Sequence, residues 1–189
     1  MDEHVVRTRM RANPEHKPGC EWRSGLLELL SDVPGYGMSM AEIGCYAGES
    51  TDVFASSGKF SRIYAVEPWL PVGSRMWRED HDGLATAERV FDEMRARHRD
   101  VIRKLRQNSV ESAPRFHAGS LDLVYVDADH SYETARRDIE LFLPKLAPHG
   151  VMAGHDYCPM WPGVERAVRD VFGRAPDKLY SDYSWMVRL

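Results

Sequence analysis

Short apolar runs alternate with amphipathic stretches along the chain, and this alternation predicts a parallel sheet flanked by helices. The run LDLVYVD at 121–127 is nearly continuous apolar and β-branched, as expected of a central strand that helices cover on both faces. Further strands are predicted at 40–44, 62–68, 101–105 and 150–154. The run at 101–105 is the weakest of these predictions, because Arg103 and Lys104 interrupt it.

The amphipathic stretches predict the helices that connect these strands. Apolar side chains recur at helical spacing in 20–32, 49–55, 84–98, 131–143 and 164–172. Two short strands, 178–181 and 184–189, follow and are joined by a tight turn around Asp182. We therefore predict an α/β fold with a Rossmann-like, doubly wound, mostly parallel seven-stranded sheet, a C-terminal antiparallel strand and helices on both faces.

Length and charge narrow the classes of protein that fit this pattern. The 189 residues suit one domain at 21–189 after a flexible polar arm at 1–20, because domains commonly contain about 100–200 residues. Asp and Glu outnumber Lys and Arg, 29 against 25, so the basic surface typical of nucleic-acid binding is not expected. Residues 1–20 lack the apolar core of a signal peptide, and no run approaches the roughly 18 apolar residues of a membrane span.

The three cysteines, Cys20, Cys45 and Cys158, show no spacing typical of a zinc site or a disulfide framework. This pattern suits a reducing cytoplasm. We expect a soluble, cytoplasmic protein, and the sequence leaves open whether it forms a homodimer.

The stretch MAEIGCYAGEST at 40–51 joins the first predicted strand to the next helix through a glycine turn. Dinucleotide-binding folds place three glycines in G-x-G-x-x-G, and the middle glycine lets the backbone approach the pyrophosphate. Gly44 and Gly48 keep the sharp turn, but Tyr46 stands at the middle position. Glu42, beside the same turn, repels a dianion and favours a cation. The turn therefore suits a ligand that has an ammonium group and no phosphates.

Glu67 ends the second predicted strand, about twenty residues past the glycine turn, where nucleoside-binding sheets bind the ribose hydroxyls with a carboxylate. The alternative is that Glu67 is a solvated strand end. A ligand that combines a ribose with an amino acid and lacks phosphate is S-adenosylmethionine, which we predict as the cofactor.

Four motifs at the ends of predicted strands together resemble the class I S-adenosylmethionine-dependent methyltransferases. They are EIGCYAGEST, VEP, LDLVYVDADHSYE and GVMAGHDY, and the resemblance covers 39–189 in order. The set is most similar to the small-molecule O-methyltransferase branch, methyltransferase family 24. This resemblance implies a final antiparallel strand and an enzyme that transfers a methyl group.

The resemblance also implies roles for residues at the strand ends. It places Glu42, Gly44, Tyr46, Gly48, Ser50 and Asp127 at the methionine part of the cofactor, Glu67 at the ribose, and Asn108 and Ser109 near the adenine. Many members carry a glycine at the position of Tyr46, and this branch often tolerates a larger residue there.

Titratable side chains follow two neighbouring predicted strands, with Asp127 and His130 after the fourth and His155 and Asp156 after the fifth. Methyl transfer to a hydroxyl requires the acceptor oxygen to lie in line with the methyl group and to lose its proton. His130 can act as the general base, because histidine titrates near neutral pH. Alternatively, Asp127, His155 and Asp156 can hold Mg²⁺ or Mn²⁺, which would lower the pKa of the acceptor hydroxyl and orient it. The two devices can also cooperate, and we predict His130 and Asp127 as the catalytic residues.

The same residues are similar to the metal-dependent catechol-type O-methyltransferases. In that pattern an aspartate ends the fourth strand, an acidic and amide pair ends the fifth, and a lysine three residues after the first aspartate is the base. His130 stands in place of the lysine, and His155 stands in place of one carboxylate of the pair. These differences favour His130 as the base.

Several of these side chains also have structural interpretations. Asp129 can cap the helix that follows it, His155 can donate to the backbone, and Asp127 can be purely structural. His117 and His149 are predicted to lie at the surface.

The aromatic loops at 69–77 and 157–163 can cover a methyl acceptor, or they can simply pack through Trp69, Trp77 and Trp161. The acceptor is expected to be a small molecule with a sugar, polyol, phenol or natural-product hydroxyl, and nitrogen stays open as the methylated atom. Two competing functions are an NAD(P)-dependent Rossmann oxidoreductase and a module that binds S-adenosylmethionine without turnover.

Overall fold

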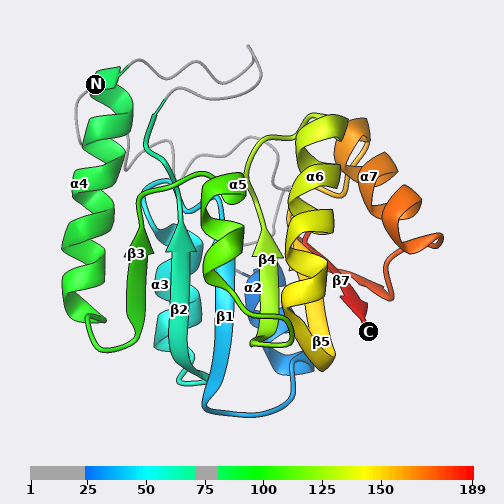
Figure 1. Cartoon of the computed structure of the whole chain (residues 1–189), viewed down its shortest axis with the longest axis horizontal. Helices are drawn as coiled ribbons and strands as arrows, with labels where there is room; N and C mark the ends of the chain where they lie inside the picture. The colour runs from blue at the N-terminus through cyan, green and yellow to red at the C-terminus, as the bar shows by residue number, and fades with distance from the viewer. Residues whose placement is uncertain (1–23, 71–80) are drawn as a thin grey trace.

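The computed structural model describes residues 24–70 and 81–189, whose strands form one seven-stranded sheet with the order β3-β2-β1-β4-β5-β7-β6 (Figure 1). The strands are β1 Met38–Ile43, β2 Phe60–Val66, β3 Ile102–Leu105, β4 Leu121–Val126, β5 Leu146–Gly154, β6 Lys178–Leu179 and β7 Trp185–Arg188. Strands β1 to β5 pair in parallel, and β7 is antiparallel to both β5 and β6. The predicted sheet with its C-terminal antiparallel strand is confirmed.

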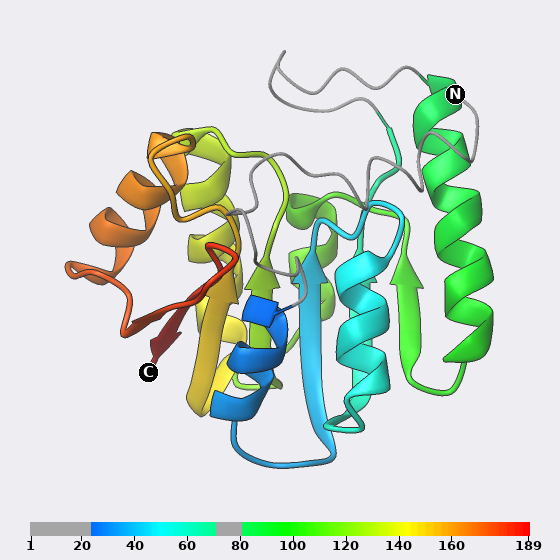
Figure 2. The same cartoon turned by 180° about the vertical axis from the view of Figure 1, so that it is seen from behind.

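Helices cover both faces of the sheet, as Figure 1 and Figure 2 show from opposite sides. One face carries α2 Ser24–Asp32, α3 Glu49–Ser56 and α4 His81–Arg97; the other carries α5 Ser109–Ser112, α6 Tyr132–Phe142 and α7 Pro162–Phe172. The chain crosses from the β1–β2–β3 half of the sheet to the β4–β5 half, so the strand order reverses between β1 and β4. Ligands of open α/β sheets bind at such a switch point, beyond the carboxyl ends of the strands.

Strand β4 has helices on both sides, which explains its continuous apolar sequence. Leu123 and Tyr125 belong to the hydrophobic cluster under α2, α3 and α4, whereas Val124 and Val126 belong to the cluster under α6 and α7. Because side chains alternate along a strand, the four positions from Leu123 to Val126 enter the two cores in turn. The strand can therefore carry its carboxyl end, and the residues after it, into the middle of the molecule.

The observed elements differ from the predicted ones mainly at their ends. Strand β5 begins at Leu146, four residues before the predicted strand, and α4 begins at His81 rather than at Leu84. The single-turn helix α5 was not predicted, because one turn is too short to show a periodic apolar pattern.

Some predictions cannot be compared with the structure. The predicted arm at 1–20, with Cys20, lies outside the described residues, as does Trp77. Among the helices of the described ranges, none combines the length and the apolar character required to cross a membrane.

Candidate active site

The glycine turn after β1 has left-handed backbone at the three positions that the sequence singled out. The φ angles are 91° at Gly44, 42° at Tyr46 and 90° at Gly48, which is the residue before α3. A Cβ on Gly44 would overlap the backbone oxygen of Asp127, and a Cβ on Gly48 would overlap the side chain of Met94. Glycine is therefore needed at both ends of the turn, because the backbones of β1 and β4 meet there and α4 packs directly on the turn.

Glu42, the last residue but one of β1, is fully buried beneath this turn. Its carboxylate accepts hydrogen bonds from the hydroxyls of Ser50 and Thr51 in the first turn of α3. Burial raises the pKa of Glu42 to about 7, although the two hydroxyl donors act in the opposite direction. The predicted pair Glu42 and Ser50 is thus joined in the structure. Thr51, which bonds the second oxygen of the same carboxylate, was not predicted as a site residue.

Glu67 lies against the glycine turn immediately after β2. Its Oε2 atom accepts from the backbone N–H groups of Cys45 and Tyr46, both at 3.3 Å, and its Oε1 atom accepts from the N–H of Trp69 at 3.2 Å. Burial raises the pKa of Glu67, although the backbone donors counteract the effect. Glu67 is therefore part of the turn rather than a solvated strand end.

Asn108 and Ser109, predicted near the adenine, begin α5. Asn108 Oδ1 accepts from the N–H of Glu111 at 2.9 Å, and Glu111 Oε2 accepts from the N–H of Asn108 at 3.1 Å, which is a capping box. Ser109 is buried, and its hydroxyl donates to Asp138 Oδ1 at 2.6 Å. Both side chains thus help to fix the loop after β3, and their contact with adenine stays a prediction.

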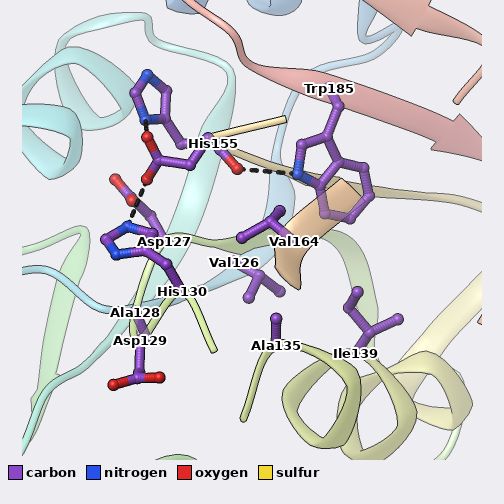
Figure 3. A pocket seen from close by; sticks show the side chains of 11 residues that line it. Val126, Asp127, Ala128, Asp129, His130, Ala135, Ile139, His155, Val164 and Trp185 are labelled. Atoms are coloured by element: carbon purple, nitrogen blue, oxygen red, sulfur yellow. Dashed lines mark hydrogen bonds and ion pairs between the residues drawn. The ribbon is translucent and has the colours of Figure 1, made fainter. Parts of the chain in front are cut away.

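The predicted titratable residues gather beyond the carboxyl ends of β4 and β5 (Figure 3). His130 Nε2 lies 2.5 Å from Asp156 Oδ2, and His155 Nδ1 lies 3.0 Å from the other oxygen of the same carboxylate. Ligand atoms of Asp127, His130 and Asp156 all lie within 4.8 Å of one another. The predicted metal ligands were Asp127, His155 and Asp156, whereas this three-residue group contains His130 in place of His155.

Burial and ion pairing shift pKa values within this group, which we call the Asp–His cluster (Asp127, His130, His155 and Asp156). Burial raises the pKa of Asp127 to about 6, and the two histidines oppose that rise. Burial also acts to raise the pKa of Asp156, but hydrogen bonds from His130 and His155 outweigh it and hold that pKa below its ordinary value. The pKa of His155 is raised to about 10, because the contact with Asp156 outweighs the cost of burying a cation.

Contacts near the Asp–His cluster test the structural interpretations of several predicted residues. The N-cap of α6 is Ser131, which excludes the alternative that Asp129 caps this helix. Asp129 instead accepts from the N–H of Ser131 at 2.8 Å. His155 pairs with the Asp156 carboxylate instead of using Nδ1 on the backbone. His117 and His149 are exposed, as predicted.

Aromatic residues from the two predicted loops are buried. Trp161 is 7% exposed, and its ring stacks on the His130 ring with 4.2 Å between centroids and 23° between planes. Trp69 is 2% exposed and packs on Phe91. Trp69 thus packs against α4, whereas Trp161 forms one side of the Asp–His cluster.

A pocket opens at this edge of the sheet and joins the Asp–His cluster to an apolar wall. The apolar lining comes from Val126, Ala135, Ile139, Val164 and Trp185. The indole N–H of Trp185 donates to the backbone oxygen of His155 at 3.1 Å, so β7 fixes the end of β5 (Figure 3). The arrangement brings carboxylates, an imidazole held by a carboxylate, and an apolar surface together within one concave site.

Comparison with known proteins identifies the family of the chain. A family model for a methyltransferase domain, that of methyltransferase family 24, matches residues 41–157, from β1 to the loop after β5. The uncharacterized protein y4gI of Sinorhizobium fredii (strain NBRC 101917 / NGR234) is 27% identical over 124 residues, which make up 62% of this chain. The chain spans 13% of the length of that relative.

Solved structures share the fold. The crystal structure of an S-adenosylmethionine-dependent methyltransferase from Aquifex aeolicus has a TM-score of 0.60 at 13% identity, with 100% of this chain and 97% of that chain covered. The structure of the O-methyltransferase NovP has a TM-score of 0.57 at 18% identity, with 88% and 76% covered. The family match covers more than half of the chain and favours a methyltransferase over the oxidoreductase alternative. The chain therefore belongs to methyltransferase family 24, whose members are S-adenosylmethionine-dependent methyltransferases.

Proposed function

We propose that the protein transfers the methyl group of S-adenosylmethionine to a hydroxyl of a small molecule, such as a sugar, polyol, phenol or natural product. The observation that carries this proposal is the Asp–His cluster beside the glycine turn, with His130 Nε2 held 2.5 Å from Asp156. Similarity in fold to the O-methyltransferase NovP supports oxygen as the acceptor atom.

The chain's own residues suggest how the donor is held. Glu42, Ser50 and the turn at Gly44, Tyr46 and Gly48 would surround the methionine part, and Asp127 would face its charged end. Glu67 would bind the ribose hydroxyls from its place against the turn. The acidic floor of the site fits a ligand with cationic sulfur and nitrogen, because a buried carboxylate is costly unless positive charge faces it.

His130 is the proposed base. Asp156 fixes one ring nitrogen, and Trp161 stacks on the ring, so the imidazole is oriented before the acceptor arrives. A base oriented by a carboxylate is the arrangement expected for removing a hydroxyl proton during transfer. Asp127, whose pKa is raised to about 6, lies within the same group and would help to place the acceptor oxygen.

The donor set also fits a divalent cation. Two carboxylates and one imidazole with atoms within 4.8 Å of one another suit Mg²⁺ or Mn²⁺, with Asp127, Asp156 and one of His130 and His155 as ligands. Bound there, the ion would lower the pKa of the acceptor hydroxyl. In that case Asp127 and Asp156 would bind the ion, and Trp161 would keep His130 in place beside it.

Methyl transfer from labelled S-adenosylmethionine to a panel of hydroxyl acceptors tests the proposal, with S-adenosylhomocysteine affinity measured in parallel by calorimetry. His130→Gln is expected to lower the rate at least about 100-fold, the usual minimum for a lost general base, with affinity for S-adenosylhomocysteine unchanged. His149→Gln, at an exposed position, is the matched control and should leave the rate unchanged.

The other outcomes separate the alternatives. Turnover in the wild type that EDTA abolishes and Mn²⁺ restores would establish the metal-assisted form. Cofactor binding with no transfer to any oxygen or nitrogen acceptor would favour the non-catalytic binding module. A His130→Gln enzyme with wild-type turnover would reject His130 as the base.

A further inference from the structure

Trp69 stands two residues after Glu67 and has an unusual backbone conformation. Its φ angle is 48°, in the left-handed region that residues with a Cβ seldom adopt, although its side chain is almost fully buried. Such conformations persist only where the surrounding structure enforces them, and they cluster at functional sites. The contacts of Trp69 therefore require an explanation beyond packing.

Trp69 is bonded to both parts of the proposed cofactor-binding surface. Its backbone N–H donates to Glu67 Oε1 at 3.2 Å, and its indole Nε1–H donates to the backbone oxygen of Tyr46 at 2.8 Å. The second oxygen of Glu67 accepts from the N–H groups of Cys45 and Tyr46. One residue thus joins the loop after β2 to the turn after β1 through its main chain and its side chain.

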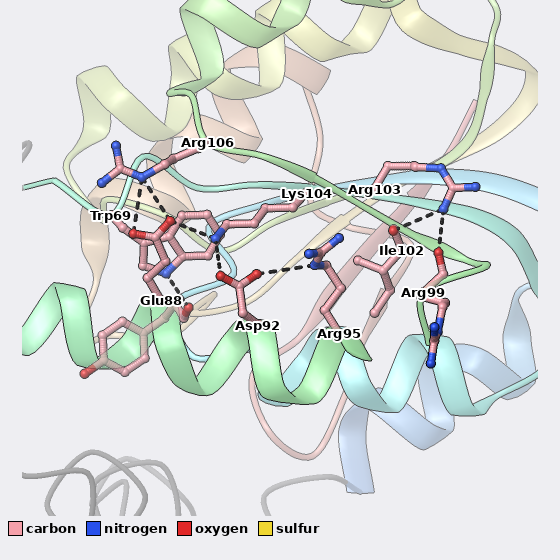
Figure 4. Close-up of polar contacts among 10 residues, drawn as sticks. Trp69, Glu88, Asp92, Arg95, Arg99, Ile102, Arg103, Lys104 and Arg106 are labelled. Carbon is pink, nitrogen blue, oxygen red and sulfur yellow. Dashed lines mark hydrogen bonds and ion pairs between the residues drawn. The ribbon is translucent and has the colours of Figure 1, made fainter. Parts of the chain in front are cut away.

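Lys104, on β3, holds the indole from the other side (Figure 4). Its Nζ atom lies 4.6 Å from the centroid of the Trp69 ring and 2.7 Å from both Glu88 Oε1 and Asp92 Oδ2 of α4. The Lys104 side chain is 15% exposed, so its charge is shielded from water and strengthens the contact with the ring. The Phe91 ring packs on the same indole with 5.0 Å between centroids.

We propose that Trp69 is a positioning residue for S-adenosylmethionine, which holds Tyr46 and Glu67 in the relative arrangement that binds the nucleoside, and that Lys104 fixes the Trp69 indole. The inference rests on the proposed function, in which Glu67 and the glycine turn contact the cofactor. Without the indole N–H, the Tyr46 carbonyl would lose its bond to the loop after β2, and fixing this part of the turn on cofactor binding would lower affinity.

Trp69→Phe tests this proposal, because it keeps an aromatic ring against Phe91 and Lys104 and removes the donor to Tyr46. The dissociation constant of S-adenosylhomocysteine, measured by calorimetry, is expected to rise about threefold to tenfold, as for one lost hydrogen bond. The KM for S-adenosylmethionine should rise in parallel, and kcat at saturating cofactor should change less than about twofold.

A matched control separates positioning from general stability. Phe142→Leu truncates a fully buried aromatic residue in the core on the opposite face of the sheet, away from Tyr46 and Glu67. It should lower the melting temperature and leave the S-adenosylhomocysteine affinity unchanged. Equal loss of affinity in Phe142→Leu and Trp69→Phe would overturn the proposal.

A second pair of variants tests the role of Lys104 without altering Trp69. Lys104→Met should raise the dissociation constant about twofold, whereas Lys178→Met, which removes a lysine paired with Asp32 near the other edge of the sheet, should not. Wild-type affinity in both Trp69→Phe and Lys104→Met would reject the positioning role and leave the proposed function intact. Absence of S-adenosylhomocysteine binding by the wild-type protein would reject both.

Discussion

Replacement of Glu42 by glutamine is expected to stabilise the protein above neutral pH and to weaken its binding of S-adenosylmethionine. Glu42 is fully buried, and its oxygens accept from the hydroxyls of Ser50 and Thr51. Glutamine has the same shape, and its oxygen and amide can bond to the same two hydroxyls once one hydroxyl turns to accept. The substitution therefore removes a titratable group with little change in packing.

The magnitude follows from the pKa of Glu42, which burial raises from 4.5 to about 7. Between these two values the unfolded chain is ionised at this position while the folded protein keeps its proton, so stability is highest below pH 4.5 and falls as pH rises. Each pH unit in that window is worth about 1.4 kcal/mol, and the whole window corresponds to a loss of about 3 kcal/mol. The glutamine variant lacks this loss.

Urea denaturation of the cofactor-free protein at pH 5 and pH 8 measures the effect. The free energy of unfolding of Glu42→Gln should exceed that of the wild type at pH 8 and approach it at pH 5, while calorimetry shows weaker binding of S-adenosylhomocysteine. Glu93→Gln, at an exposed pair with Arg89 on α4, is the control. A Glu42→Gln protein that is less stable than the wild type at pH 8 would refute the reasoning.

Three further predictions concern other parts of the structure. Gly44→Ala should lower the free energy of unfolding by more than about 2 kcal/mol in urea, because it adds a left-handed residue with a Cβ against the Asp127 oxygen. Gly25→Ala should destabilise the protein by about 1–3 kcal/mol, because its Cβ would overlap the buried Asp182 carboxylate. In a double-mutant cycle with Asp182→Ala, measured by thermal melting, additive losses of stability would contradict this contact. Because the pKa of His155 is raised from 6.5 to about 10, this residue contributes stability that is fully present below pH 6.5 and is lost toward pH 10. His155→Gln should therefore make the melting temperature depend less on pH over that range, and an unchanged pH dependence would contradict the raised pKa.

The sequence predicted the sheet and the grouping of the site residues well, because both depend on patterns that are local in the chain. The continuous apolar run of β4 indicated a central strand, and Asp127 lies in the site because it follows the carboxyl end of this strand. Parallel strands bring their carboxyl ends to one edge, so Asp127 and Asp156 were expected to lie together. The proximity of these two residues could be predicted without knowledge of side-chain conformations.

The partners of these residues could not be read from the sequence in the same way. Both histidines contact Asp156, but only His130 joins Asp127 and Asp156 in the group whose ligand atoms lie within 4.8 Å of one another. This grouping depends on where the loops after β4 and β5 turn, and Asp156 itself has a left-handed φ of 62°. The role of Trp69 depends on a similar backbone conformation. Left-handed residues with a Cβ leave no periodic pattern in a sequence, because tertiary contacts enforce them.

The close contact between Gly44 and the backbone of Asp127 has a consequence for how the protein acquires its site during folding. Strands β1 and β4 are neighbours in the sheet but far apart in the sequence, with α3, β2, α4, β3 and α5 between them. A nascent chain that ends before β4 has the glycine turn but lacks the Asp127 backbone that packs against Gly44. Because such long-range pairing carries a large loop-closure cost, it forms late, and a ligand that recognises the closed site will stabilise only the fully paired sheet. Binding of S-adenosylhomocysteine can therefore report on completed folding of the whole chain.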